Sequence, residues 1–213
     1  MRPGPHERLR DVVSPARTVA EGSAAALGAA TAAFETTAEL HRQWVSANGD
    51  ALIQAVDVMT DAVNRGGRIL SFGNGGSATD AQHLAGELVG RFLEVRRALS
   101  ALALTADSAV LTALANDDGY ETVFVRQVEA HGRSGDVAVA ITTSGTSPNV
   151  TRALVRAREL GLATIAITGN DGGEAGRAAD VHVNVPTAST PRAQEVHRTI
   201  LHVMCELIEK GLR

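Results

Sequence analysis

The sequence predicts an α/β fold in which helices cover both faces of a central five-stranded parallel sheet. Five short apolar runs support this prediction, because they are nearly continuous, as expected of strands that are buried on both faces. Helical segments separate most of these runs, and that alternation is typical of a parallel sheet. The chain has 213 residues, which is long enough for one sizeable core, so one domain is the default expectation.

The N-terminal part of the chain is predicted to be helical. Residues 1–15 contain three prolines and are expected to form a loose tail, so that residues 16–213 make up a single domain. Two alanine-rich helices are expected at 16–46 and 50–65, with "ANGD" as the break between them. In "LIQAVDVMTDAV" the apolar residues recur three and four positions apart, as an amphipathic helix requires.

The rest of the chain alternates between strands and helices. The predicted strands cover "RILSFGN" and residues 99–104, 136–142, 163–169 and 181–186. The predicted helices cover residues 77–90, 107–115, 121–131, 148–160 and 192–211. Parallel sheets bind ligands beyond the carboxyl ends of their strands. Every glycine- or hydroxyl-rich turn discussed below follows a predicted strand, so these turns are the candidate binding regions.

Charge and composition exclude several classes of function. A net charge of −4 gives no general attraction to nucleic acid, and no nucleic-acid partner is expected. Cys205 is the single cysteine, which excludes an intrachain disulfide and fits a reducing compartment; its apolar neighbours predict a buried, inert thiol. No apolar run approaches the roughly 20 residues that span a bilayer, and the first residues lack the apolar core of a signal peptide. We therefore expect a cytoplasmic protein without a membrane partner.

A glycine-rich turn, "GNGGS" at residues 73–77, follows the first predicted strand. Glycines allow a ligand to approach the backbone closely, and Ser77 could cap the next helix while the first amides of that helix face an anion. The turn is neither a Walker loop nor a GxGxxG fingerprint. Taken alone, it fits a simple change of chain direction as well as it fits a binding site.

A second turn, "TTSGTSPN" at residues 142–149, supplies hydroxyl groups after a different strand. Pro148 suits the first turn of the following helix. Hydroxyls and helix-terminal amides bind phosphate without a cation, which suits a chain without a basic patch. Two such turns at one sheet edge predict a phosphate or sugar-phosphate site. Its hydroxyls are those of Thr142, Thr143, Ser144 and Ser147.

Two other turns have less specific patterns. Asn116 and Asp117 stand at the end of a short predicted helix, where they could bond sugar hydroxyls or simply terminate the helix. "TGNDGG" at 168–173 is interpreted as a tight loop that leads away from the sheet.

His83 and Glu87 lie four residues apart on a predicted helix, where they share one face. Alone, they could be an ordinary surface pair. The last helix offers further imidazole, carboxylate and amide groups, and imidazole and carboxylate are ordinary ligands of zinc. Spacing predicts a metal site between the two helices but leaves its ligands open, because the last helix has several candidates: Gln194, Glu195, His197 and His202.

Several segments together resemble the sugar isomerase (SIS) family, and within it the sedoheptulose 7-phosphate isomerase (phosphoheptose isomerase) branch. They are "GNGGSATDAQHLAGELVGRF", "ALANDDGYETVFVRQVEAHGRSGDVAVAITTSGTSPNV", "ITGNDGG" and "AQEVHRTILHVMCELIE". The resemblance runs from about residue 50 to the C-terminus. It implies a three-layer α/β/α fold, a homotetramer with sites at subunit interfaces, and conversion of sedoheptulose 7-phosphate into D-glycero-D-manno-heptose 7-phosphate through an enediol.

The resemblance also implies roles for individual residues. One zinc ion per subunit is expected on His83, Glu87, Gln194 and His202, and the acid–base pair is Glu87 with His202. Arg91 matches an arginine expected to reach a neighbouring subunit's site, while Pro191 stands where the family often has an aspartate. The implied substrate contacts are Asn74, Gly75, Gly76, Ser77, Glu87, Arg91, Asn116, Asp117, Thr142, Thr143, Ser144, Ser147 and Gln194.

Two alternatives stand beside this reading. Some SIS relatives, such as a bacterial replication-initiator-associating protein, are regulatory and not heptose isomerases. Others act on a different phosphosugar. The presence of the full set of metal and acid–base residues favours an enzyme. One conflict stays open at this point: Glu87 and His202 are assigned both to the metal and to proton transfer, and a lone pair bound to zinc cannot accept a proton.

Overall fold

The computed structural model describes residues 19–212. The tail predicted for residues 1–15 lies outside the described residues. By internal contacts the chain divides into two units, with the boundary between Glu39 and Leu40. The sheet and every candidate site residue belong to the second unit.

Five parallel strands form one sheet, as predicted, and the structure gives their order as β2-β1-β3-β4-β5. The strands are β1 (Ile69–Gly73), β2 (Ala101–Ala103), β3 (Val137–Thr142), β4 (Ala163–Gly169) and β5 (Val181–Val185). The strand order reverses between β1 and β3. Doubly wound sheets bind ligands at that reversal, beyond the carboxyl ends of the strands. The two predicted binding turns follow these two strands.

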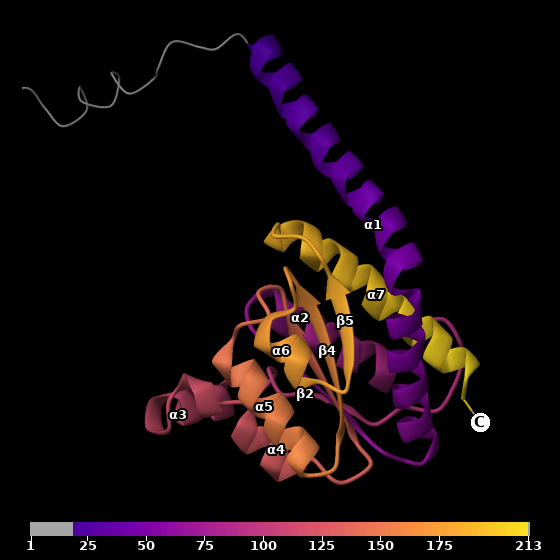
Figure 1. Cartoon of the computed structure of the whole chain (residues 1–213), viewed down its shortest axis with the longest axis vertical. Coiled ribbons are helices and arrows are strands. Elements are labelled where there is room, and N and C mark those ends of the chain that lie inside the picture. The colour runs from indigo at the N-terminus through magenta and orange to yellow at the C-terminus, as the bar shows by residue number, and fades with distance from the viewer. Residues whose placement is uncertain (1–18, 213) are drawn as a thin grey trace, which may run out of the picture. The chain divides into compact units, whose positions relative to one another are not determined.

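Helices cover both faces of the sheet and give three layers (Figure 1). In β3, Val139 and Ile141 pack with α1, α2 and α7, whereas Ala138 and Ala140 pack on the opposite face with α4, α5 and α6. This alternation follows from the two-residue period of a strand. The helices are α1 (Val19–Asn64), α2 (Gly76–Val89), α3 (Ser108–Asp117), the 3-10 turn η1 (Tyr120–Thr122), α4 (Val125–His131), α5 (Pro148–Glu159), α6 (Gly173–Ala178) and α7 (Thr190–Lys210).

The predicted break at "ANGD" is wrong, because α1 runs without interruption through it. Trp44 and Leu52, on either side of the break, are both buried in the same core cluster, as is Val56. A glycine in a helix costs only about 1 kcal/mol, and burial of this apolar face outweighs it. The Asn48 side chain also stays within the helix, where its Nδ2 donates to the Trp44 carbonyl at 3.2 Å.

The structure differs from the prediction in two shorter helical segments. The helix expected at 121–131 is divided into η1 and α4. The loop expected at 168–173 leads into a short helix, α6, which the sequence analysis missed. A Cβ at either Gly172 or Gly176 would overlap the ring of His182. These glycines make room for the imidazole. Because glycine has a low helix propensity, the sequence pattern did not indicate a helix here.

Candidate active site

A cavity of about 290 Å³ lies at the carboxyl ends of β1 and β3. It brings together the two turns that the sequence singled out, with the start of α7 as a third side. Its lining contains no lysine or arginine, so an anion there would meet hydroxyls and amides. The lining residues are Asn74, Gly75, Gly76, Ser77, Thr142, Thr143, Ser144, Ser147, Thr190 and Gln194.

Three helices begin at this cavity, and helix N-termini favour anions. The N-caps of α2, α5 and α7 are Gly75, Ser147 and Ser189, and none of them forms a side-chain cap hydrogen bond. The expectation that Ser77 caps α2 is wrong, because Ser77 lies buried inside the first turn. Gly75 takes the cap position with φ 56° and ψ −122°, a positive-φ conformation that glycine adopts without strain.

Asn74 joins the two turns through its side chain. Its amide forms a reciprocal pair of 2.9 Å hydrogen bonds with the amide of Asn149, which is buried at the start of α5. The Tyr120 hydroxyl donates to Asn74 Oδ1 at 3.1 Å. The Asn74 side chain therefore holds the turns in register, and Asn149 and Tyr120 are contributors that sequence reasoning missed.

Gly76 is placed so that only a glycine leaves room for its neighbour. A Cβ at this position would overlap the side-chain amide of Gln194, which lines the same cavity. Gly86, in the same helix, has nothing within 4 Å of an added Cβ. An added methyl group would therefore disturb the site at Gly76 but meet open space at Gly86, which makes Gly86 a matched control position.

We expect Gly76→Ala to raise KM for a phosphosugar substrate by about tenfold, the equivalent of one lost hydrogen bond of ~1.4 kcal/mol. The added methyl group displaces the flexible end of Gln194, so the fold survives. Gly86→Ala should leave KM unchanged and slightly stabilise α2. Steady-state kinetics of both variants checks this. An unchanged KM in Gly76→Ala would show that the position of Gln194 does not matter for binding.

His83 and Glu87 extend from α2 toward His202 of α7. The Nε2 atoms of His83 and His202 lie 2.7 Å apart, and Oε1 of Glu87 lies 3.6 Å from His83 Nε2. The rings meet edge-on with 4.9 Å between centroids. The helical spacing of His83 and Glu87 thus serves a contact between two helices and not only a surface pair.

Burial lowers the pKa of His83, and the positive charge of Arg198 lowers it further. The neutral imidazole is therefore favoured. A neutral ring has a free nitrogen lone pair, which is what binding a metal or accepting a proton requires.

His83, Glu87 and His202 have side chains of the types that bind zinc, but the structure does not arrange them as a metal site. Within residues 22–212, no group of three or more His, Cys, Asp or Glu side chains is placed to hold a metal ion. Two nitrogens on one tetrahedral zinc would be about 3.3 Å apart, whereas those of His83 and His202 are at the 2.7 Å distance of a hydrogen bond. The pair would have to open slightly to admit an ion.

Gln194, the fourth ligand implied by the resemblance, lies with its amide against Gly76 and lines the hydroxyl-rich cavity.

Gln194 also borders a second cavity of about 480 Å³. In this cavity Arg198 Nη2 lies 2.5 Å from Oδ1 of the buried Asp80. Burial raises the pKa of Asp80, and Arg198 opposes that shift. Asp80 and Arg198 are a second pair that sequence reasoning missed. Pro191 also borders this cavity.

The other metal candidates of the last helix are directed elsewhere. His197 is fully buried, and its Nε2 lies 2.9 Å from the Thr168 carbonyl, to which it donates. Its Nδ1 is buried with no hydrogen-bond partner in the described structure. Glu195 forms an ion pair of 3.0 Å with Arg192. Cys205 is buried as predicted, and burial raises the pKa of its thiol to about 12.

His197 should make stability fall as the solution becomes acidic. Burial lowers its pKa to about 4, against about 6.5 in an unfolded chain. Between these values the unfolded chain binds the extra proton, so stability is fully present above pH 6.5 and is lost toward pH 4, by at most about 1.4 kcal/mol per pH unit. Urea unfolding of wild type and His197→Gln from pH 7.5 to 4.5 checks this. Parallel pH profiles in the two proteins would contradict it.

Four of the implied substrate contacts line neither cavity: Glu87, which lies beside His83, and Arg91, Asn116 and Asp117. Asn116 and Asp117 are exposed at the end of α3, where the amide of Asn116 donates to Asp117 Oδ1 at 2.7 Å. Arg91 is exposed just beyond α2. The structure of one chain does not bring these residues to the hydroxyl-rich cavity, and their roles stay predictions.

A buried ion pair holds the segment after α2 against α7. The Glu209 carboxylate accepts backbone hydrogen bonds of 2.9 Å from Phe92, Leu93 and Glu94, and one of 2.8 Å from Arg96 Nε. Burial alone would raise the pKa of Glu209, but these bonds lower it to about 2. These bonds also position a side chain at the candidate active site, because the ring of Phe92 stacks on His202 with 5.4 Å between centroids.

The class of protein follows from comparison of this chain with known proteins. Residues 34–169 match the family model described as the SIS domain. The chain is 54% identical over 157 residues to the phosphoheptose isomerase of Geotalea daltonii, a match that covers 74% of this chain and 82% of that protein. It is 49% identical over 177 residues to the phosphoheptose isomerase of Aquifex aeolicus, covering 83% and 93%.

A solved structure agrees with these relatives. The phosphoheptose isomerase from Neisseria gonorrhoeae superposes with a TM-score of 0.81 at 41% identity, over 86% of this chain and 98% of that one. The chain belongs to the SIS domain family and, within it, to the phosphoheptose isomerases. The resemblance stated from the sequence is confirmed.

Proposed function

We propose that this chain is an aldose–ketose isomerase that converts D-sedoheptulose 7-phosphate into D-glycero-D-manno-heptose 7-phosphate through an enediol. The observation that carries the proposal is one arrangement: a hydroxyl-lined, cation-free cavity at three helix N-termini, with a His–His–Glu group on the neighbouring faces of α2 and α7. The curated relatives are named for this reaction class.

The cavity serves to hold the phosphate. Thr143, Ser144 and Ser147 supply hydroxyl groups, and the first turns of α2 and α5 supply backbone amides and a favourable dipole. Binding the phosphate far from the reacting carbons fixes the position of C1 and C2 without taking part in the chemistry, which is the positioning that such a reaction needs.

The proton transfer is assigned to the group between the helices. Glu87 removes the proton from C1 of the ketose and returns it to C2, which passes through the enediol. His202 moves protons at the sugar oxygens, and its stacking on Phe92 fixes the plane of its ring. Oε1 of Glu87 is the oxygen nearest His83, so we assign the proton transfer to Oε2.

We also propose that one zinc ion per chain is held by His83, Glu87, Gln194 and His202. When bound, the ion would polarise a carbonyl oxygen and stabilise the charge that develops on it. The support is the chemistry of the donors and the placement of His83 and Glu87 on α2 beside His202 on α7.

Metal content should show this directly. We expect about one zinc per chain by elemental analysis after incubation with zinc and gel filtration. His83→Ala should lose it, and His131→Ala, which removes an exposed histidine outside the site, should not. Wild-type protein without bound metal, or full retention in His83→Ala, would refute the metal assignment independently of activity.

We propose a homotetramer, in which Arg91 reaches the site of a neighbouring chain. Large apolar side chains support association, since Val45 and Ile53 are exposed by 56% and 49%, and Leu93 and Val95 by 63% and 86%. Sedimentation should give four times the chain mass of 22.1 kDa; a monomer with full activity would exclude the role of Arg91.

We further propose that the enzyme works in the cytoplasm, the setting that fits its free, buried Cys205. Within residues 19–212, no helix is long and apolar enough to cross a membrane.

The test of the proposed function is a substrate panel followed by NMR. Zinc-loaded protein is incubated separately with sedoheptulose 7-phosphate, fructose 6-phosphate and ribulose 5-phosphate. We expect conversion of the heptulose phosphate, at a kcat/KM at least about 100-fold above the others. Preferred turnover of a shorter ketose would assign the site to another phosphosugar. No turnover of any of them by folded, zinc-loaded protein would favour a regulatory role.

A further inference from the structure

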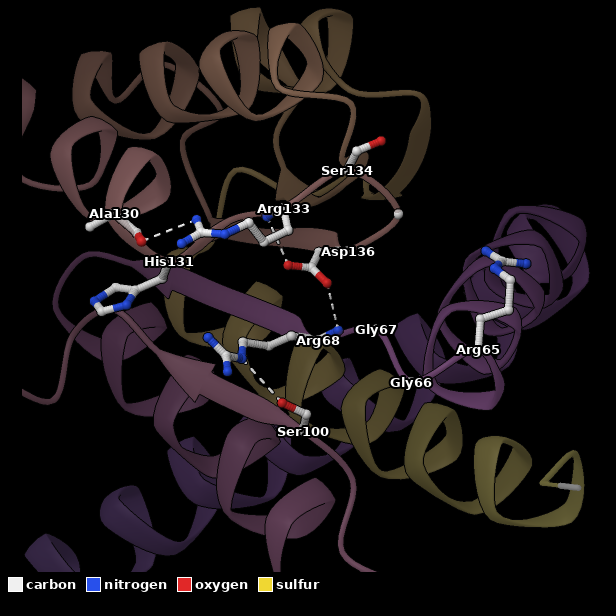
Figure 2. Close-up of a pocket in the computed structure, with 11 residues that line it drawn as sticks. Arg65, Gly66, Gly67, Arg68, Ser100, Ala130, His131, Arg133, Ser134 and Asp136 are labelled. Atoms are coloured by element: carbon white, nitrogen blue, oxygen red, sulfur yellow. Dashed lines mark hydrogen bonds between the residues drawn. The ribbon is translucent and has the colours of Figure 1, made fainter.

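A cavity of about 620 Å³ lies at the opposite edge of the sheet from the candidate active site. It is built from the residues just before β1, β2 and β3 and from the end of α4 (Figure 2). Its volume falls in the range of small-molecule sites, roughly 300–1,000 Å³. The lining residues are Arg65, Gly66, Gly67, Arg68, Ser100, Ala130, His131, Arg133, Ser134, Gly135 and Asp136.

Positive charge is concentrated in this cavity, although the chain as a whole carries −4. Three arginines line it against a single carboxylate, that of Asp136. Both oxygens of Asp136 are already occupied by the chain, because Oδ1 accepts from the Arg68 backbone N–H at 2.8 Å and Oδ2 from that of Arg133 at 2.9 Å. The carboxylate therefore shapes the floor of the cavity and makes no ion pair with the guanidinium groups there. Arg65 has a carboxylate outside the lining, with its Nη1 4.0 Å from Asp61 Oδ2.

Two of the guanidinium groups are held in place with donors to spare. Arg68 uses Nε on the Ser100 hydroxyl at 3.1 Å, and Arg133 uses Nη1 on the carbonyls of Ala130 and Gly132 at 3.2 and 2.7 Å. Among residues 22–212, neither forms an ion pair with a carboxylate. Figure 2 shows both guanidinium groups and the ring of His131 on the same side of the view.

From these observations we propose that this cavity is a second binding site, for a small ligand that carries two or more phosphate groups. Arginine matches phosphate oxygens with its planar fork of donors. The volume exceeds that of a phosphate group alone, so the ligand also has a body such as a sugar or a nucleoside. A concave site of this size in an acidic chain selects a small molecule over a nucleic acid.

The test measures binding of pyrophosphate and of ADP by titration calorimetry, using the whole chain. To silence the active-site cavity, the measurements are made in the Ser144→Ala/Ser147→Ala background. We expect both ligands to bind there, ADP more tightly. Adding Arg68→Gln/Arg133→Gln should weaken binding at least about tenfold, because charged hydrogen bonds are lost.

The matched control removes the same charge elsewhere. Arg126 and Arg152 are 60% and 59% exposed and lie outside this cavity, so Arg126→Gln/Arg152→Gln should leave binding unchanged. Equal losses in both double variants would reduce the effect to overall charge and overturn the proposal. So would unchanged binding in Arg68→Gln/Arg133→Gln, or no binding to the silenced protein.

Two further readouts keep the result interpretable. Arg68→Gln/Arg133→Gln in the wild-type background should keep isomerase activity, so failure here is distinct from failure of the proposed function. If the double variant does not fold, Arg68→Gln alone removes a guanidinium group that, among residues 22–212, hydrogen-bonds only to the Ser100 hydroxyl. The same tenfold loss of ADP binding is expected, and unchanged ADP affinity in that folded single variant would overturn the proposal.

Discussion

Glu87→Gln is expected to lower kcat at least about 100-fold with little change in KM. A positioned general base contributes roughly 10²- to 10⁴-fold, and glutamine keeps the size and shape of the side chain while losing its ability to accept a proton. Steady-state rates measured by NMR on zinc-loaded proteins check this. The fold should be unaffected, because the Glu87 side chain is one-quarter exposed and, among residues 22–212, its one ion pair is the 3.6 Å contact with His83.

The control for this experiment is Glu206→Gln, which removes an exposed carboxylate of α7 that pairs with Lys210. It should retain full activity. If Glu87→Gln instead retained turnover with normal zinc content, the reaction would stand and the assignment of Glu87 as its base would be wrong. If it lost both zinc and activity, the metal role of Glu87 would account for the loss.

Glu209→Ala is expected to cause the largest loss of stability, about 3 kcal/mol or more. The substitution leaves the buried Arg96 guanidinium and three part-buried backbone N–H groups without their acceptor, and breaking a buried pair from one side typically costs about 3–5 kcal/mol. For a chain of this size that corresponds to a fall in Tm of roughly 6–12 °C. Thermal unfolding followed by circular dichroism measures it.

Glu206→Ala serves again as the matched control and should stay within about 0.5 kcal/mol of wild type.

Glu209 should make the stability of the folded chain fall at acidic pH. Its pKa is about 2 in the folded chain against 4.5 ordinarily, so its contribution is present above pH 4.5 and is lost as the pH falls toward 2. A Glu209→Ala variant as stable as wild type would show that the segment around Phe92 does not depend on this pair.

Much of the fold could be predicted because the sheet is buried on both faces. Strands such as Val137–Thr142 have apolar side chains on both sides, so their continuous runs stand out from the amphipathic helices around them. What could not be predicted depends on tertiary packing. The continuity of α1 through Gly49 follows from burial of Trp44 and Leu52, and α6 forms around the ring of His182 despite its glycines.

In the candidate site, too, some features could be predicted from the sequence and others depend on tertiary packing. The two binding turns were recognisable because glycine and hydroxyl residues follow predicted strands, and the structure adds that the strand order reverses at that point. Their partners were not recognisable, because the Asn74–Asn149 amide pair joins residues 75 positions apart, and the Asp80–Arg198 pair joins two different helices. Helical spacing could pair His83 with Glu87 but could not choose His202 over His197; the structure separates them by directing His197 into the core.

One measurement tests the central claim most directly: NMR time courses that start separately from sedoheptulose 7-phosphate and from D-glycero-D-manno-heptose 7-phosphate. For an isomerase of this pair, both reactions should converge on one ratio of the two heptose phosphates, at rates proportional to enzyme and with the phosphate ester intact. If both substrates stay unchanged in the presence of folded, zinc-loaded protein, or are consumed toward different products, the chain does not catalyse the proposed isomerisation.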